Sequence, residues 1–307
     1  MGDGEGTGDV ASRYASAWRT AKAALQAESF RPRRLLGQNF LTDGRVAARI
    51  LEAAKAENDW RTVEVGTGPG TLTRVLSDLG GDVVTFEIDA AIAEIARQVL
   101  AGRDNVHLVL GDCLAGKHAL SPELESALAE GHRLYGGRVR LVANLPYSIA
   151  APLILGLLES TLSPQLLVVM VQEEVAERLA ASEGSKIYGA LSVLIQWLAR
   201  VEKVVDVPPE RFWPAPQIRS RVLKLTRRDP PIVDPDAYPA LKALVQKGFN
   251  HRRKTLAKTW REDPEAVSAI TSAGLDPRIR IEQLSPEALL ELTQRAMAGG
   301  SVSRKSP

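Results

Sequence analysis

The stretch E-V-G-T-G-P-G, residues 64–70, joins a short apolar run to a segment in which apolar residues have helical spacing. The run T-V-E-V (62–65) is typical of a buried strand, and T-L-T-R-V-L-S-D-L (71–79) is typical of a helix. Glycines at such a junction let the backbone approach a ligand closely, and the helix N-terminus that follows commonly holds a nucleotide. The order of strand, glycine loop and helix therefore predicts a nucleotide-binding α/β fold.

The spacing of the glycines narrows the class of ligand. The dinucleotide fingerprint G-x-G-x-x-G would need a glycine at position 71, which is a threonine. A phosphate-binding P-loop would need Gly-Lys-Ser/Thr after the loop, and the sequence does not continue in this way. Both observations count against NAD and nucleoside triphosphates.

Strands and helices continue to alternate along the chain, which predicts a doubly wound α/β sheet. Further strands are expected at 82–88, 106–110, 138–143 and 166–171, and further helices at 46–56, 91–100, 150–159 and 172–182. A polar stretch separates the third strand from the fourth. After about residue 228 the pattern changes to short amphipathic helices without strands, beyond a linker that reads R-R-D-P-P-I-V-D-P-D.

This pattern predicts a main domain and a small C-terminal helical domain. The expected boundaries are an N-terminal extension over 1–30, a Rossmann-like domain over 31–228, a helical domain over 229–298 and a flexible tail over 299–307. Within the extension, the Gly-rich residues 1–10 are expected to be disordered, and the Ala-rich residues 11–29 to form a helix.

The composition excludes several classes of protein. The chain has 307 residues, a net charge of +2 and one cysteine, Cys113, so an intramolecular disulfide is excluded and a reducing, cytoplasmic compartment is expected. No apolar run reaches the roughly 20 residues that a membrane span needs. We therefore expect no membrane anchor. The four histidines lack the spacing of metal ligands, so we expect no metal site either.

Acidic residues end the second and third predicted strands. Glu87 follows Gly66 at a spacing of about 20 residues, where a carboxylate accepts hydrogen bonds from ribose hydroxyls. Asp112 ends the next strand and is placed to hold an adenine amino group. Asp89 is better explained as a helix cap. Together with Gly66 and Gly68, these acids on the carboxyl edge of one sheet indicate S-adenosylmethionine as the cofactor.

The sequence N-L-P-Y at residues 144–147 follows the fourth predicted strand on the same edge. The side-chain oxygen of Asn144 and the carbonyl of Leu145 can each accept an N–H bond from an adenine amine. This would aim the nitrogen lone pair at the methyl group and stabilise the charge that develops. Pro146 would fix the turn and Tyr147 would stack on the base. No strong general base is needed, because the methylated ammonium loses its proton readily.

At this point the chain resembles the small-subunit ribosomal RNA adenine N6,N6-dimethyltransferases, from about residue 33 to 295. The resemblance rests on L-G-Q-N-F-L (36–41), E-V-G-T-G-P-G-T-L-T, F-E-I-D, G-D-C-L, N-L-P-Y-S-I-A-A-P, V-Q-E-E-V-A-E-R-L-A-A, S-K-I-Y-G-A-L-S-V, F-W-P-A-P-Q-I-R-S and N-H-R-R-K-T-L. It implies a class I S-adenosylmethionine-dependent methyltransferase sheet. It also implies dimethylation of two adjacent adenines near the 3′ end of small-subunit rRNA, in a pre-ribosomal particle, by a monomer.

The resemblance also assigns roles to single residues. It implies cofactor contacts by Asn39, Leu41, Gly66, Glu87, Asp112 and Asn144, and an adenine pocket made by Asn144, Leu145, Tyr147 and Phe212, with Phe212 as a second stacking ring. The sequence departs from the family pattern at Thr67, Pro69, Ser148 and Gln217. None of these departures removes a proposed catalytic group.

A basic run, His251-Arg252-Arg253-Lys254, lies on an expected helix of the second domain. Lys258 would share a face with Lys254 at i, i+4, so these lysines are expected to contact RNA phosphates. Arg252 and Arg253 are also candidates for RNA contact, although one of them can instead brace the interface between the two domains. The alternative is that the whole run is only a solvated face.

Two other functions fit parts of the sequence. A large-subunit rRNA adenine methyltransferase of the macrolide-resistance type shares the fold, but S-K-I-Y-G-A-L-S-V and N-H-R-R-K-T-L favour the small-subunit enzyme. A non-catalytic assembly or transcription factor can use the same fold to bind nucleic acid. The presence of Glu87, Asp112, Asn144 and Tyr147 counts against that second alternative.

Overall fold

The computed structural model describes residues 5–33, 36–55, 59–79, 81–116 and 119–303. The chain forms two compact units, one of residues 1–176 and 201–227, and one of residues 177–200 and 228–307. Residues 177–200, which the sequence analysis placed in the first domain, thus group with the C-terminal unit. No helix among the described residues is long and apolar enough to cross a membrane.

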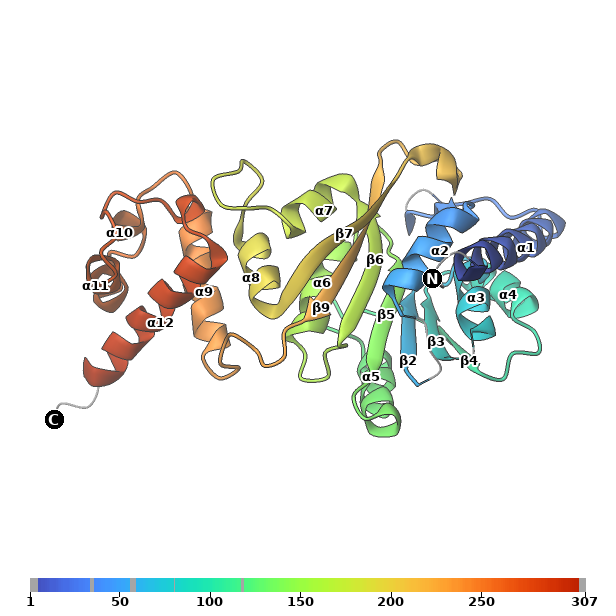
Figure 1. Cartoon of the computed structure of the whole chain (residues 1–307), viewed down its shortest axis with the longest axis horizontal. Helices are drawn as coiled ribbons and strands as arrows, with labels where there is room; N and C mark the ends of the chain where they lie inside the picture. Colours follow the sequence, from blue (N-terminus) through green and yellow to red (C-terminus); the bar gives the residue numbers. More distant parts are fainter. Residues whose placement is uncertain (1–4, 34–35, 56–58, 80, 117–118, 304–307) are drawn as a thin grey trace. The chain divides into compact units, whose positions relative to one another are not determined.

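The first unit is built on a seven-stranded sheet in the order β4-β3-β2-β5-β6-β9-β7 (Figure 1). The strands are β2 (Arg61–Val65), β3 (Asp82–Glu87), β4 (Val106–Leu110), β5 (Val139–Asn144), β6 (Leu166–Gln172), β7 (Ala199–Val207) and β9 (Ser220–Arg227). Strands β2 to β6 pair in parallel, and β9 is antiparallel to β6. The five predicted strands are confirmed within one or two residues, whereas β7 and β9 were not predicted.

Helices cover both faces of this sheet. They are α2 (Gly44–Ala53), α3 (Thr71–Asp78), α4 (Ala90–Val99), α5 (Pro122–Tyr135) and α6 (Ala150–Glu159). The chain steps from β2 to β3 and β4 in one direction and returns to β5 and β6 in the other. Right-handed crossovers therefore place α3 and α4 on one face and α5 and α6 on the opposite face. As a result β2, β5 and β6 are buried along nearly their whole length.

Side-chain caps fix where several helices begin. Asp43 accepts hydrogen bonds from two backbone N–H groups of α2, and Asp89 accepts one from Ala91 in α4, so the predicted cap at Asp89 is confirmed. Helix α5 occupies the stretch that the sequence analysis read as polar. It has a readable start, because Ser121 caps it and Pro122 stands at its first position. Because many of its residues are charged and exposed, its narrow stripe of apolar residues is hard to recognise in the sequence.

Helix α1 (Glu5–Ala27) begins earlier than predicted. The expected disorder is wrong for residues 5–10, while residues 1–4 lie outside the described residues. The helix extends because Val10 packs against the core and Asp9 pairs with Arg13 one turn later. Its buried side chains recur at helical spacing and are Tyr14, Ala17, Ala21 and Leu25.

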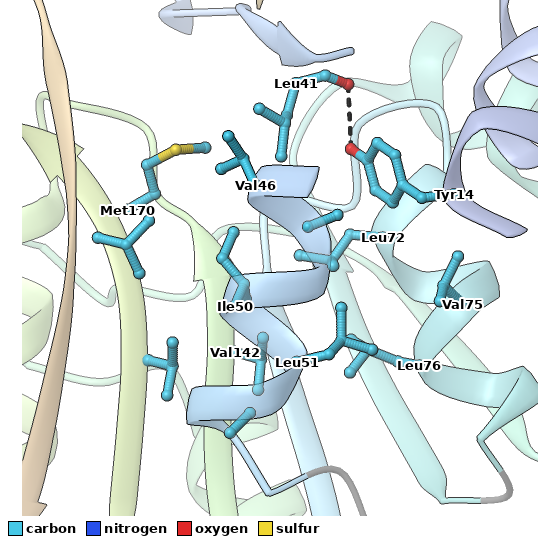
Figure 2. Packing of buried hydrophobic residues seen from close by; sticks show 14 of the residues in the cluster. Tyr14, Leu41, Val46, Ile50, Leu51, Leu72, Val75, Leu76, Val142 and Met170 are labelled. Atoms are coloured by element: carbon cyan, nitrogen blue, oxygen red, sulfur yellow. Dashed lines mark hydrogen bonds between the residues drawn. The ribbon is translucent and has the colours of Figure 1, made fainter. Parts of the chain in front are cut away.

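An apolar cluster lies between the sheet and helices α1, α2 and α3 (Figure 2). Ile50 of α2 stands at its centre, between Leu72 of α3 and the sheet residues Val142 and Met170. All four are nearly or completely excluded from solvent. This packing holds the glycine loop before α3 against the end of β5, which brings two of the predicted motifs together.

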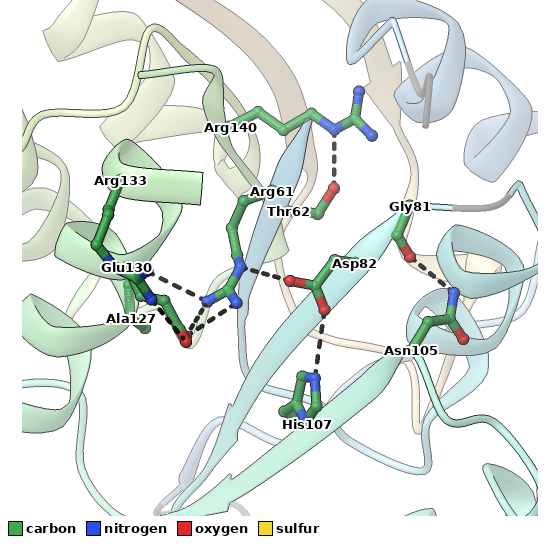
Figure 3. Close-up of polar contacts among 10 residues, drawn as sticks. All are labelled: Arg61, Thr62, Gly81, Asp82, Asn105, His107, Ala127, Glu130, Arg133 and Arg140. Carbon is green, nitrogen blue, oxygen red and sulfur yellow. Dashed lines mark hydrogen bonds and ion pairs between the residues drawn. The ribbon is translucent and has the colours of Figure 1, made fainter. Parts of the chain in front are cut away.

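The amino edge of the sheet carries a polar network (Figure 3). Arg61, the first residue of β2, is 3% exposed and pairs with Asp82 at 2.6 Å and Glu130 at 2.8 Å. His107 lies 3.3 Å from the same Asp82. A buried guanidinium needs such partners, so this edge is closed and structural. The pocket described below lies at the opposite edge.

The second unit is helical, as predicted. Helix α7 (Glu173–Leu179) leads into it, and it contains α8 (Ala190–Leu198), α9 (Tyr238–Asn250), α10 (Leu256–Thr259), α11 (Pro264–Ser272) and α12 (Pro286–Ser303). No strand occurs among its described residues after 228. Two buried hydrogen bonds fasten its first segment to its last, from Tyr188 Oη to the Leu284 carbonyl at 2.9 Å and from Trp197 Nε1 to the Pro286 carbonyl at 2.7 Å.

Candidate active site

A pocket of about 890 Å³, open to solvent, lies at the carboxyl edge of the sheet in the first unit. This is the edge where open α/β sheets bind ligands. The predicted site residues that line it are Asn39, Gly66, Gly68, Glu87, Asp112, Asn144, Leu145, Pro146 and Tyr147. The structure therefore brings together residues from four strand ends and from the segment before β1 (Phe40–Leu41).

The glycine loop forms one wall of the pocket. Gly66 and Gly68 have φ values of +83° and +54°, a region that residues with a side chain rarely adopt. A Cβ at Gly66 would meet the Asn144 carbonyl oxygen at 3.4 Å, and one at Gly68 would meet the Phe40 ring at 3.1 Å. Neither position therefore has room for a side chain unless its neighbour shifts.

Glu87 fastens this loop from the end of β3. Its Oε2 accepts from Gly68 N at 2.9 Å and its Oε1 from Asp89 N at 3.0 Å. Burial raises the pKa of this carboxyl, while the backbone N–H donors lower it. The N–H of Ile88 is a third backbone donor to this carboxyl, which leaves at least one of its roughly four lone-pair sites for a ligand. The side chain lines the pocket, where it can accept from a hydroxyl group of a ligand.

Asp112 and Ile88 lie beside Glu87 at the pocket wall. Asp112 is exposed, and its Oδ1 accepts from Leu114 N at 2.9 Å, which leaves Oδ2 for a ligand. Ile88 is 52% exposed and lines the pocket. It offers an apolar face to a planar ring. The sequence analysis missed Ile88, although its place directly after the acid at a strand end was a usable signal.

Asn144, the last residue of β5, has a defined amide orientation. Its Nδ2 donates to the Asn39 carbonyl at 3.0 Å. Within the described residues, no donor occupies the Oδ1 of Asn144 or the carbonyl oxygen of Leu145. The backbone N–H of Leu145 donates to the Met170 carbonyl at 3.1 Å. Two hydrogen-bond acceptors are therefore available at the end of this strand.

Tyr147 is held by a side chain that the sequence analysis did not assign. Its Oη lies 2.8 Å from the Oγ of Ser220, which is 1% exposed at the start of β9. Burial raises the pKa of the Tyr147 hydroxyl, so it stays neutral near pH 7. The carbonyl of Pro146 accepts from Ile149 N at 3.2 Å, which completes the turn into α6. The ring is thus half-buried in a fixed position at the pocket.

Two predicted site residues do not line the main pocket. Leu41 of β1 pairs with Phe212 of β8 (Phe212–Trp213), and both side chains are at most 5% exposed in the core cluster of Figure 2. Leu41 lines a smaller adjoining cavity together with Asn144 and Glu64. The stacking role of Phe212 stays a prediction.

Glu64 is buried beneath the glycine loop. Its Oε2 accepts from Thr73 at 2.6 Å and from Thr85 at 2.7 Å, and Thr67 lies 2.7 Å from Thr85. Burial raises the pKa of the Glu64 carboxyl to about 8, and the charge of Glu87 acts in the same direction. Thr67, a departure from the family pattern, is therefore part of a hydrogen-bonded network that holds the loop.

In the second unit, the basic run forms a turn between α9 and α10, so the expected helix is wrong there. Thr255 caps α10, which places Lys254 before the helix and Lys258 within it. Arg252 is engaged within the second unit, where it donates to Glu282 at 3.0 Å and to the carbonyls of Lys186 at 2.6 Å and Ser185 at 2.8 Å.

The three other cations of the predicted RNA-binding set are Arg253, Lys254 and Lys258. Their side chains are exposed and form no ion pair with a described residue. Their contact with RNA stays a prediction. Within the described part of the chain, no group of three or more His, Cys, Asp or Glu side chains is arranged to hold a metal ion.

Comparisons with known proteins are consistent across sequence and structure. The family model "Ribosomal RNA adenine dimethylase" matches residues 29–297. A "Ribosomal RNA small subunit methyltransferase A" from Moorella thermoacetica is 38% identical, over 89% of this chain and 95% of the relative. One of the same name from Paenarthrobacter aurescens is 39% identical, over 86% and 88%.

Two solved structures share the fold. A dimethyladenosine transferase from Plasmodium falciparum has a TM-score of 0.69 at 22% identity and covers 85% of this chain and 98% of its own. The 23S rRNA methyltransferase ErmE has a TM-score of 0.65 at 25% identity and covers 84% of this chain and 100% of its own.

Proposed function

This chain belongs to the ribosomal RNA adenine dimethylase family, and we propose that it dimethylates N6 of two adjacent adenines near the 3′ end of small-subunit rRNA. The methyl donor is S-adenosylmethionine. The small-subunit methyltransferases at 38% and 39% identity support this choice of subunit over the 23S enzyme at 25%. We place the reaction in the cytoplasm, on a pre-ribosomal particle, with a monomeric enzyme.

The pocket fits the cofactor that this activity needs. Glu87 keeps accepting capacity for a ribose hydroxyl, Asp112 has a free oxygen for an adenine amine, and the exposed Ile88 supplies an apolar face. Glycine at positions 66 and 68 lets the loop lie close to Asn144 and Phe40, where a Cβ would press on them. Asn39 lines the pocket from the segment before β1, and Leu41 lines the smaller adjoining cavity.

The single observation that carries the catalytic assignment is the orientation of Asn144. Since its Nδ2 is engaged by the Asn39 carbonyl, its Oδ1 is the atom left to accept a bond. An adenine amine has two N–H groups, and Asn144 Oδ1 and the Leu145 carbonyl can accept one each. These acceptors orient the amine lone pair and stabilise the positive charge that grows on nitrogen.

The other residues position the base. The ring of Tyr147, fixed by Ser220, provides a stacking surface for an adenine extruded from the RNA. S-adenosylmethionine, when bound, supplies the methyl group to N6. The nitrogen then loses its extra proton to water, because a methylated arylammonium is a strong acid. The chain therefore needs to provide acceptors and stacking rather than a general base.

Phosphate contact by the second unit would supply affinity without base specificity. Arg253, Lys254 and Lys258 are exposed cations without an acidic partner among the described residues. Arg252 is engaged by Glu282 and by two backbone carbonyls, so we assign it to bracing the loop before Tyr188. Contacts of this kind with the RNA backbone set affinity and its salt dependence.

The proposal is tested by transfer of labelled methyl groups onto three acceptors: unmethylated small subunits, naked small-subunit rRNA and large subunits. We expect incorporation into small subunits at two neighbouring adenines, mapped by mass spectrometry as N6,N6-dimethyladenine. Incorporation into large subunits instead would support the macrolide-resistance type of enzyme. Cofactor-independent RNA binding with no transfer to any acceptor would support a non-catalytic factor.

A further inference from the structure

Helix α1 lies before the residues that the family model matches, yet it is packed into the first unit as closely as any core helix. Its stripe of Tyr14, Ala17, Ala21 and Leu25 is at most 2% exposed. Its backbone also approaches α2 so closely that a Cβ at Gly44 would overlap the carbonyl of Ala11. The contact therefore requires glycine at this position. Because α1 is packed this tightly, it also restricts the position of the chain segment that it contacts.

That segment is the stretch Asn39-Phe40-Leu41, which reaches the pocket. The hydroxyl of Tyr14 donates to the Leu41 carbonyl at 3.0 Å, and both residues are buried (Figure 2). Phe40 lies between Asn39 and Leu41 in this segment, and Leu25 and Phe30 pack against its ring. Burial raises the pKa of the Tyr14 hydroxyl well above its usual range, so the hydroxyl remains a donor near neutral pH.

The same segment, through Asn39, also contacts the side chain of Asn144. Asn39 uses its carbonyl to accept from Asn144 Nδ2 at 3.0 Å. An asparagine amide rotated by half a turn would present its N–H₂ group to the adenine amine, and two donors would face each other. The bond to Asn39 therefore selects the rotamer in which Oδ1 is available. Its effect depends on where the backbone of residues 39–41 lies.

We propose that Tyr14 is a positioning residue for methyl transfer: by binding the Leu41 carbonyl, it holds the Asn39 carbonyl where it orients the Asn144 amide. The N-terminal helix is thereby part of the catalytic apparatus rather than an appendage. This rests on the proposed function, since it is the role of Asn144 Oδ1 as an acceptor that gives the orientation its value.

The test compares Tyr14→Phe with Tyr188→Phe. Tyr188 is a matched control, because its buried hydroxyl also donates to a leucine carbonyl, Leu284, at 2.9 Å, within the second unit. Both variants are measured below their melting transitions, as followed by circular dichroism. The readouts are the single-turnover rate at saturating cofactor and small subunits, and the KM for subunits.

We expect Tyr14→Phe to lower the single-turnover rate about 10-fold, since small misplacements of positioning groups reduce rates by up to about 10²-fold, and to leave the KM for subunits unchanged. Tyr188→Phe should lower the melting temperature comparably and leave the single-turnover rate within about 2-fold of wild type. Equal effects of the two variants on the rate, or none from either, would overturn the proposal.

A second readout needs no activity. In protein labelled with ¹⁵N-asparagine, the Asn144 side-chain amide signal is identified by its loss in Asn144→Asp. Tyr14→Phe should displace this signal and Tyr188→Phe should not. If wild-type protein transferred no methyl group at all, the proposed function would fail while this spectrum still decided the role of Tyr14. An unmoved signal in Tyr14→Phe would mean that α1 only stabilises the fold.

Discussion

The hydroxyl of Tyr147 lies 2.8 Å from the Oγ of Ser220, and this contact joins the turn after β5 to the first residue of β9. Tyr147 and Ser220 are 73 positions apart in the chain. One bond thus ties the proposed stacking ring to a strand that is buried on the sheet. A ring fixed in this way binds a base without first losing its own rotational freedom.

Ser220→Ala should lower methyl transfer by about 2- to 10-fold and leave cofactor affinity unchanged, since a neutral hydrogen bond contributes roughly 0.5–1.5 kcal/mol. Tyr147→Phe removes the same bond and keeps the ring, so it should have a similar effect. In a double-mutant cycle of single-turnover rates, the double variant should be no slower than either single one. Fully additive losses would show that the two hydroxyls act independently.

Asn144→Ala should lower the single-turnover rate by about 10²–10³, the usual cost of losing one acceptor or donor that stabilises developing charge. Most of the cofactor affinity should remain, because Glu87 and Asp112 are untouched. Calorimetry for the cofactor and rapid-quench measurement of methyl transfer separate the two effects. A rate near that of wild type would remove Asn144 from the mechanism.

Glu87→Ala should weaken S-adenosylmethionine by roughly 1.5–3 kcal/mol, the range for hydrogen bonds to a charged group, or about 10- to 150-fold in Kd. The glycine loop would also lose its bond from Gly68 N to Glu87 Oε2. Glu94→Ala is the control, because this acid lies on α4 with 64% of its side chain exposed and pairs with Arg97. Unchanged calorimetric affinity in Glu87→Ala would contradict the ribose contact.

Glu64 should lower the free energy of unfolding as the pH rises, whereas most acids raise it. Its folded-state pKa of about 8 lies above the value of roughly 4.3 for an unfolded chain. Between these values the folded protein holds one more proton than the unfolded one. The stabilisation is therefore complete below about pH 4.3 and is lost at up to about 1.4 kcal/mol per pH unit as the pH rises toward 8.

Glu64→Gln keeps an acceptor for Thr73 and Thr85 but cannot titrate. In urea unfolding at pH 5, 6, 7 and 8, the wild type should lose stability relative to this variant as the pH rises. The comparison with the variant cancels the titration of all other groups. Parallel pH profiles for the two proteins would show that Glu64 is ionised in the folded state.

Replacing Lys254 and Lys258 together by alanine should lower the slope of log affinity for small subunits against log salt by about 1.4–1.8, at 0.7–0.9 per phosphate contact. Cofactor affinity should not change. Arg278→Ala is the control, because this exposed arginine already pairs with Asp276 at 3.2 Å. If the double variant keeps both the slope and the affinity of the wild type, these lysines are a solvated face.

The sequence predicted those parts of the fold that depend on short-range patterns. Three glycines between a strand and a helix, and acids at the ends of two successive strands, identified one edge of the sheet as the site. This works because parallel strands all end at the same edge, so that residues far apart in the chain converge. The pocket residues Gly66, Glu87 and Asn144 follow from that rule.

Elements with weaker local signals were missed. Helix α5 is largely polar on its surface, and β7 is half-exposed, so neither has a continuous apolar pattern. Residues 5–10 are Gly-rich and acidic by composition, and the helix extends over them with Val10 packed against the core and Asp9 paired with Arg13. The run at 251–254 forms a turn, because Arg252 is drawn into contacts with Glu282 and two carbonyls.

The sequence by itself therefore determined the fold class and the residue types at the strand ends, which follow from periodicity and motif spacing, and the family, which follows from the resemblance of its motifs. Only the tertiary structure decided which way the Asn144 amide points, which serine holds Tyr147 and which tyrosine anchors Leu41. The physical reason is that each of these is a single hydrogen bond between residues 27 to 105 positions apart. Such a bond forms only after the packing of helices and sheet has brought donor and acceptor within about 3 Å.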